Sequence, residues 1–320
     1  MRQNSFRFVC LLFGLSFLGG EMKAQQKSAH ETGLRSKSTS ELAELEQVIT
    51  KVNYDESKVP VYTLPDVLTL TNGRKVTTKK EWVEKRRPEL LRLFETQIYG
   101  KAPVRSKDLH FRLLNEDREA LGGLATRKEV AVYLTKDEKH YLTVLMYLPN
   151  RRKGTVPMFF GINFKGNHAI HPDEGITFPS EERMIAYGRK RMFPRGSAAS
   201  RWPVEMLMEH GYGLATFYRG DIDPDFDDGF QNGVHPLYYK KGQTRPAEDE
   251  WGTLAAWAWG MSCAMDYFET DKDIDAKRIA IFGHSRLGKT TLWAGAIDPR
   301  FALVISNDSG CGGAALLGGK

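Results

Sequence analysis

The chain has 320 residues, of which 41% are hydrophobic, and a formal net charge of +6 at pH 7. This is enough for one large domain or two small ones, each with a real core. The positive charge is spread along the chain, and its densest stretch, residues 79–87, is interrupted by Glu81 and Glu84. That pattern indicates a solvated helix face, so we expect no nucleic-acid partner.

The N-terminal segment, residues 1–24, has the pattern of a secretory signal peptide. Arg2 and Arg7 give it a basic start, residues 8–20 form an apolar core too short to span a bilayer, and Ala24 offers a small residue at a cleavage point. No other segment is long and apolar enough to cross a membrane. We therefore expect a secreted or periplasmic protein with no membrane partner in its mature form.

Residues 25–105 are expected to form a polar linker followed by an N-terminal helical arm. An Asn72-Gly73 pair between alternating residues predicts a hairpin turn. Thr78 with Glu81 matches a capping box, which predicts a helix start.

A second helix is predicted to begin at Pro88, which suits the first helical position, and to end at Gly100. Its apolar residues recur at helical spacing and should form a stripe that faces the core. The stripe consists of Leu90, Leu91, Phe94 and Ile98.

Residues 106–320 alternate between short apolar runs and helical patterns, which predicts one catalytic domain. The predicted strands are 110–114, 129–134, 141–149, 156–164, 212–218, 278–283 and 301–308, and the predicted helices are 200–211, 249–269 and 290–296. The runs at 129–134 and 141–149 are expected to pair antiparallel. Antiparallel strands first, then buried strands alternating with helices, predict a three-layer, mostly parallel α/β sheet in the order of the α/β-hydrolase fold.

Residues 283–290, GHSRLGKT, match two motifs at once. The spacing of Gly283, Gly288 and Lys289 fits a phosphate-binding P-loop. The same glycines flank Ser285 as in a nucleophile elbow, although Leu287 stands where the general elbow pattern has glycine. P-loops usually follow the first strand of their domain, whereas most of a sheet precedes this motif. The elbow is therefore favoured, and nucleotide binding stays an alternative.

The wider sequence resembles the glucuronoyl esterases, carbohydrate esterase family 15, in their bacterial branch. The resemblance runs from about residue 60 to 315 and is strongest at five stretches, which are GINFKGNHAI, SRWPVE, AWAWGMSCAMDY, GHSRLGKT and SNDSGCGGAA. Members of that family hydrolyse the 4-O-methyl-glucuronoyl esters that join glucuronoxylan to lignin alcohols. The resemblance therefore implies a serine carboxylic-ester hydrolase acting on a plant cell-wall polysaccharide, with neither metal nor cofactor.

The same resemblance implies a role for four residues. Ser285 is the nucleophile, and Arg286 supports the oxyanion through its backbone N–H and side chain. Lys289, one helical turn later, binds uronate hydroxyls. Asp308 occupies the position of the triad acid, where some family members have glutamate; it also ends an apolar strand at the carboxyl edge of the sheet, where α/β active sites gather. The alternatives are a structural ion pair for Arg286, a solvated helix residue for Lys289 and a turn residue for Asp308.

A serine triad also needs a histidine, which in this fold follows the acid. All eight histidines of the chain precede Ser285. His284 should pack against the sheet, and bases at His168, His171 or His235 would be out of order. We therefore expect a C-terminally truncated hydrolase domain whose catalytic histidine lies beyond residue 320 and whose activity is impaired. The alternatives are a carbohydrate acetyl (acetylxylan) esterase and a non-catalytic carbohydrate-binding remnant.

Three cysteines are too few for a disulfide framework. Cys10 leaves with the signal peptide, and Cys263 and Cys311 are expected to be buried free thiols, although they could pair in an exported protein. No cysteine and histidine spacing suggests zinc. Residues 221–230 are acidic but do not match a calcium-binding EF-hand loop, because Asp228 stands at the glycine position. The sequence thus predicts no metal site.

Overall fold

The computed structural model describes residues 55–59, 61–186 and 192–314. The chain divides into two compact units, one of Met1–Pro65 with Gly318–Lys320 and one of Asp66–Leu317. Apart from the short helix η1, Glu56–Lys58, all structural features discussed below lie in the second unit. The expected signal peptide lies outside the described residues. Among the helices that the structure describes, none has the length and apolar character needed to cross a membrane.

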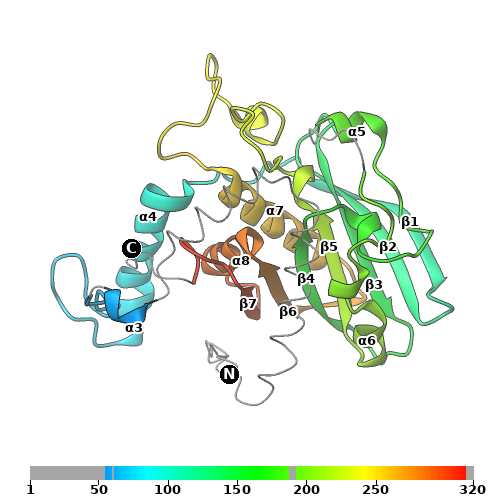
Figure 1. Cartoon of the computed structure of the whole chain (residues 1–320), viewed down its shortest axis with the longest axis horizontal. Coiled ribbons are helices and arrows are strands. Elements are labelled where there is room, and N and C mark those ends of the chain that lie inside the picture. Colours follow the sequence, from blue (N-terminus) through cyan, green and yellow to red (C-terminus); the bar gives the residue numbers. More distant parts are fainter. Residues whose placement is uncertain (1–54, 60, 187–191, 315–320) are drawn as a thin grey trace. The chain divides into compact units, whose positions relative to one another are not determined.

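Within the described part of the chain, seven strands form one sheet in the order β1-β2-β3-β5-β4-β6-β7 (Figure 1). β1, β2, β3 and β5 pair antiparallel, and β5, β4, β6 and β7 pair parallel. This confirms the predicted α/β-hydrolase arrangement, including the antiparallel pair β2–β3. The strands are β1 His110–Ala120, β2 Ala125–Tyr133, β3 Tyr141–Pro149, β4 Val156–Asn163, β5 Gly213–Tyr218, β6 Ile274–His284 and β7 Leu303–Asn307.

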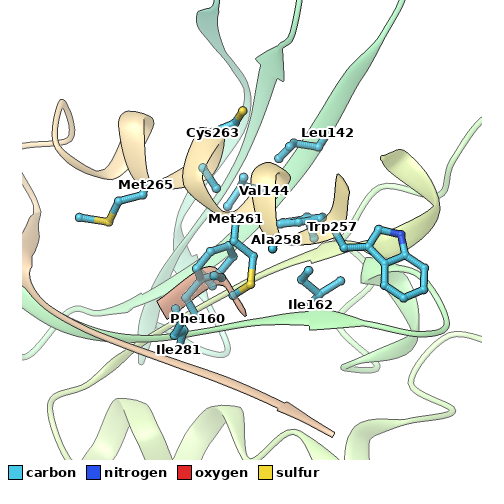
Figure 2. Close-up of a cluster of buried hydrophobic side chains, with 14 of the residues drawn as sticks. Leu142, Val144, Phe160, Ile162, Trp257, Ala258, Met261, Cys263, Met265 and Ile281 are labelled. Carbon is cyan, nitrogen blue, oxygen red and sulfur yellow. The ribbon is translucent and has the colours of Figure 1, made fainter. Parts of the chain in front are cut away.

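Helices cover both faces of the sheet. Successive strand residues point to opposite faces, so one strand contributes side chains to two cores. Val144 of β3 and Phe160 of β4 belong to the large core under α7 (Thr253–Phe268) and α8 (Arg286–Ile297), where Met261 is also buried (Figure 2). Tyr147 of β3 faces the other way, into a smaller core beside α6 (Val204–Glu209). β6 contributes Ile279 and Ile281 to the large core, and β7 packs against that core through Val304.

The remaining helical elements connect or precede these layers. They are α3 Lys79–Glu81, α4 Arg87–Phe94, α5 Glu181–Ala186, the π-helices η2 Trp82–Arg86 and η3 Glu95–Tyr99, and the 3₁₀ helices η1 Glu56–Lys58, η4 Asn167–Ala169, η5 Ala199–Arg201, η6 Arg219–Asp221 and η7 His235–Tyr238.

The start of the N-terminal arm agrees with the sequence in most details. Thr69 and Lys75 form a β-bridge across the turn at Gly73, whose φ is +84°. The Thr78 hydroxyl accepts a hydrogen bond from the Glu81 N–H, as a capping residue does. The reciprocal bond of a capping box differs, because the Glu81 carboxylate accepts from the backbone N–H of Thr77.

A second helix, α4, begins at Arg87, one residue before the predicted start, and Pro88 lies in its first turn. No break separates it from the first helix, because the π-helix η2 ends immediately before α4. Proline has no N–H to donate to the preceding turn, and a locally wider turn accommodates its ring. The segment ends at Gly100 as predicted, with φ of +76°. The predicted core-facing stripe is only partly buried, since Phe94 and Ile98 remain 40% and 47% exposed.

A buried ionic network anchors the loop between β4 and α5. Asp173 accepts hydrogen bonds from Tyr147, Arg127 and the Gly175 N–H at 2.7, 2.7 and 2.9 Å. Burial pushes the pKa of the Asp173 carboxyl upward, but these hydrogen bonds outweigh burial and lower the pKa below its ordinary value. The network fixes Asp173, and with it the loop that follows the carboxyl end of β4.

Candidate active site

Ser285 lies on a strained turn between β6 and α8. Its φ of 56° and ψ of −129° place it in a region that non-glycine residues avoid. Its backbone N–H donates to the Asn307 carbonyl at 3.0 Å, which ties the turn to β7. The side chain is half-buried at the carboxyl edge of the parallel strands. This is the geometry that the nucleophile-elbow interpretation predicts.

The two glycines of the motif are required by close backbone approach. A Cβ on Gly283 would lie 2.2 Å from the Leu287 carbonyl oxygen, and one on Gly288 would lie 3.0 Å from the Asn307 carbonyl oxygen. The turn therefore accommodates Leu287 at the position where the general elbow pattern has glycine. Leu287 points into the core at 1% exposure, and Gly288 makes the close contact with β7 instead.

Arg286 begins α8 and extends toward the loop after β5. Its Nη1 contacts both carboxylate oxygens of Asp225 at 2.9 Å, and the Arg219 guanidinium contacts the same carboxylate at 3.0 Å. Both guanidinium carbons lie 5.9 Å from the centre of the Phe164 ring. The structural ion pair considered for Arg286 therefore exists, and it places a carboxylate between two arginines next to Ser285.

Lys289 lies one turn into α8 and is half-buried. A Cβ added to Gly313 would lie 3.0 Å from the Lys289 Cγ, so the segment after β7 closely approaches the lysine stem. Among the described residues, no carboxylate lies within ion-pair distance of its ammonium group. A substrate hydroxyl would therefore not have to displace a bound partner there.

Asp308 directly follows β7, and Ser285 directly follows β6. The two strands pair in parallel, with His284 opposite Asn307, so both residues emerge from neighbouring strand ends. Asp308 is exposed, has φ of 48°, and makes no side-chain hydrogen bond with another described residue. Its position is compatible with both the predicted acid and the alternative turn residue.

The histidines near this edge of the sheet are engaged elsewhere. Side-chain Nε2 atoms of His168 and His171 contact the Phe193 carbonyl at 3.0 Å and Glu205 at 2.8 Å, and His235 Nδ1 contacts Asp223 at 3.2 Å. His284 does not pack against the sheet as predicted. It is exposed and contacts the Asn307 side chain at 3.2 Å, because the neighbouring strand end lies beside it.

Sequence comparisons place this geometry among known esterases. Residues 206–318 match a family model described as glucuronyl esterase of fungi. Over 271 residues, the chain is 52% identical to a carbohydrate esterase of an unknown prokaryotic organism, a match that covers 82% of this chain and 62% of that protein. It is 34% identical over 149 residues to 4-O-methyl-glucuronoyl methylesterase 1 of Phanerochaete chrysosporium, covering 43% of this chain and 30% of that protein.

A solved structure decides the family. The glucuronoyl esterase from Solibacter usitatus is 46% identical, has a TM-score of 0.77, and matches over 82% of this chain and 68% of its own. The chain belongs to the glucuronoyl esterase family. This confirms the resemblance first noted in the GHSRLGKT stretch. The chain spans 62% of the length of the prokaryotic carbohydrate esterase.

The sequence singled out residues at the ends of β6 and β7 and on α8, but not three others. Asp225, Arg219 and Phe164 complete the surroundings of the Arg286 side chain. The acidic stretch of residues 221–230 was expected to form a loop at the rim of the active site, but its sequence indicated no partner for Asp225. In the described part of the chain, no group of three or more histidine, cysteine or carboxylate side chains could hold a metal ion.

Cys263 and Cys311 are both free thiols, and only one of them is buried. Cys263 lies inside α7, where burial raises the pKa of its thiol, and Cys311 is exposed. The expectation of two buried thiols is therefore wrong for Cys311, which follows β7 at the edge of the sheet.

Proposed function

We propose that the chain is a serine carboxylic-ester hydrolase that acts on 4-O-methyl-glucuronoyl esters between glucuronoxylan and lignin alcohols. One observation carries the proposal. Ser285 occupies a strained turn at the carboxyl end of β6, directly before the N-terminus of α8, in a chain of the glucuronoyl esterase family. The similarity to 4-O-methyl-glucuronoyl methylesterase 1 of Phanerochaete chrysosporium supports the substrate class.

The geometry suits acyl transfer. Attack of the Ser285 hydroxyl oxygen on the ester carbonyl would form a tetrahedral oxyanion and then an acyl-enzyme, releasing the alcohol. The first N–H groups of a helix have no intrahelical partner, and the α8 dipole places partial positive charge at this end. The Arg286 N–H is therefore suited to stabilise the oxyanion. Lys289 is proposed to bind the sugar hydroxyls, and Asp308 to act as the triad acid.

We propose that turnover by this 320-residue chain is slow. Attack by a serine requires a base to take its proton, and the base is usually a histidine held by a carboxylate. His168, His171, His235 and His284 all make other contacts. Removing one triad member typically leaves a rate that is still about 10³–10⁴ times that in water, from binding and oxyanion stabilisation. A slow reaction is therefore expected, to which Ser285 adds only when another base takes its proton.

The test measures glucuronate released from methyl D-glucuronate over hours by liquid chromatography. We expect slow release above the buffer rate with the wild-type chain and with Ser285→Ala alike, because binding and oxyanion stabilisation do not need the serine. Added imidazole, a base that can take the serine's proton, should speed release by the wild type only. Equal release by the two proteins in imidazole would rule out the proposed chemistry. Release as fast as that of the Solibacter usitatus esterase would instead rule out the proposal of slow turnover.

A second substrate distinguishes a glucuronoyl esterase from an acetyl esterase. Acetylated xylo-oligosaccharides carry the sugar on the alcohol side of the ester, so a residue that binds uronate hydroxyls should matter only for the glucuronate substrate. Lys289→Ala is expected to lower glucuronate release and to leave any acetate release unchanged. Preferential cleavage of the acetyl ester by the wild type would favour an acetylxylan esterase.

We further propose that the protein is exported to the periplasm or the extracellular space. The basic start, short apolar core and small residue at Ala24 support this proposal. Expression in a bacterial host followed by mass spectrometry of the purified protein tests it. A mature N-terminus near Gln25 is expected, and an intact Met1 in the exported fraction would contradict signal cleavage.

A further inference from the structure

Positive charge gathers at the first turn of α8, which begins directly after Ser285. Arg286 and Lys289 project from α8, and Arg219 follows directly after β5. Asp225 is the acidic side chain that bridges two of these groups, with its carboxylate between Arg286 and Arg219 at 2.9 and 3.0 Å. The sequence motif explains the cations on α8, but it does not explain why an acid 61 residues earlier should neutralise them.

We propose that Asp225 determines specificity, by making the site prefer the neutral glucuronoyl ester over free glucuronate. The inference rests on the proposed function, because that function defines the two ligands. They differ in charge, since the ester substrate is neutral whereas the acid product, and every unesterified uronate side group, is an anion. Discrimination between such ligands is a difference of two affinities and can come from a group that disfavours one of them.

The contact geometry explains how Asp225 would discriminate. An arginine without a partner binds a carboxylate strongly, often through two hydrogen bonds. Arg286 already contacts both oxygens of Asp225, so a free uronate would have to compete with a resident carboxylate and would meet its negative charge. The ester is neutral, so Asp225 does not repel it, and hydrogen bonds are enough to bind it. Asp225 therefore limits retention of product and capture of unesterified chains.

A purely structural role for Asp225 accounts for less. The Arg286 side chain is 51% exposed, so its ion pair with Asp225 lies at the solvent edge and contributes little to stability. The Arg219 side chain is only 11% exposed, and a structural contribution of its pair with Asp225 would appear as a loss in thermal unfolding, not as tighter glucuronate binding. The loop is fixed by a different residue. Asp223 is buried and accepts hydrogen bonds from Thr253 and His235, and its carbonyl accepts one from Trp257. The loop thus has its own anchor two residues before Asp225.

The experiment measures the dissociation constants of sodium D-glucuronate and methyl D-glucuronate by saturation-transfer NMR and calorimetry, for the wild type and Asp225→Asn. We expect Asp225→Asn to bind free glucuronate about tenfold more tightly, the effect of removing one unit charge about 5 Å away at a partly solvated site. Affinity for the methyl ester should change less than twofold. Raised salt should shrink the gain, because it screens exposed charges.

Two matched variants isolate the cause. Asp227→Asn removes the same charge from an exposed position in the same loop, and should leave both dissociation constants unchanged. Asp225→Glu keeps the charge and should keep the wild-type preference. Adding Arg286→Gln to Asp225→Asn should abolish the gain. Thermal unfolding of each variant shows whether it is folded.

The outcomes separate this inference from the proposed function. Glucuronate affinity that is unchanged or weaker in folded Asp225→Asn, including no detectable binding in either protein, would overturn the role of Asp225. A gain of equal size in Asp227→Asn would overturn it too. Failure of the methyl ester to bind any variant would instead count against the proposed function, whichever way the glucuronate measurement turns out.

Discussion

Replacing Ser285 by glycine should make the protein more stable than replacing it by alanine, although both changes remove the hydroxyl. The φ of 56° and ψ of −129° are disfavoured for any residue with a Cβ and accessible to glycine. Within the described residues the Ser285 hydroxyl makes no hydrogen bond, so neither variant loses one. The comparison therefore isolates the backbone strain at the turn.

The magnitude follows from two opposing terms. Backbone strain of this kind costs about 1–3 kcal/mol, and glycine removes it. Glycine also raises the conformational entropy of the unfolded chain, which costs about 0.5–1 kcal/mol relative to alanine. The net gain for Ser285→Gly over Ser285→Ala is thus about 1 kcal/mol, which in a unit of this size raises the Tm by about 3 °C.

Thermal and urea unfolding of the two variants, followed by circular dichroism, measure the difference. Ala198→Gly is the control, because Ala198 has an ordinary φ of −118° and glycine should destabilise the protein there. If Ser285→Gly is no more stable than Ser285→Ala while Ala198→Gly behaves as expected, the turn stores no strain and the argument fails.

Three further predictions concern the supports of the site. Gly283→Ala should lower the free energy of unfolding by about 2–4 kcal/mol, because the added Cβ would lie 2.2 Å from a backbone oxygen. Gly252→Ala should be tolerated in the same unfolding assay, because the nearest atom to its Cβ would be 3.8 Å away. Equal losses of Tm in the two variants would contradict this. Asp173→Asn should make stability depend less on acid. The pKa of the Asp173 carboxyl in the folded protein lies below 3.8, so the carboxylate stabilises the fold above about pH 4, and this contribution is lost as the pH falls through the folded pKa. Urea midpoints of the variant that fall as steeply as those of the wild type between about pH 6 and 2 would contradict this. Asp223→Ala should cost about 2–4 kcal/mol, because it leaves the buried His235 ring and the Thr253 hydroxyl without their shared acceptor. A loss below about 1 kcal/mol in urea unfolding would show that these hydrogen bonds are dispensable.

The centre of the sheet could be predicted from the sequence because its strands are buried on both faces. The runs that became β4 and β5 are almost wholly apolar and short, a pattern that few other structures produce. The elbow could be predicted for a related reason, since a tight strand-to-helix turn needs glycine at fixed offsets. In the N-terminal arm, apolar spacing indicated burial, but Phe94 and Ile98 are substantially exposed. Periodicity shows which residues share a face, but not whether anything packs against that face.

The surroundings of Arg286 could not be predicted, because its partner is supplied by tertiary structure. Asp225 lies in an irregular loop 61 residues earlier, where no periodicity gives a direction to a side chain. Nor did the sequence indicate that His235 would be anchored on Asp223. An acidic loop is compatible with metal binding, solvent exposure or ion pairing, and only the strand order that brings β5 and β6 to the same edge selects among them.

The hydrogen bond from Ser285 to Asn307 makes the nucleophile depend on the outermost strand of the described sheet. Local elements of a fold can open with smaller free energies than global unfolding. Each separation of β7 from β6 would release the turn at Ser285 while the layers under α7 stay packed. Amide exchange at Ser285 should therefore report how often the candidate site is assembled.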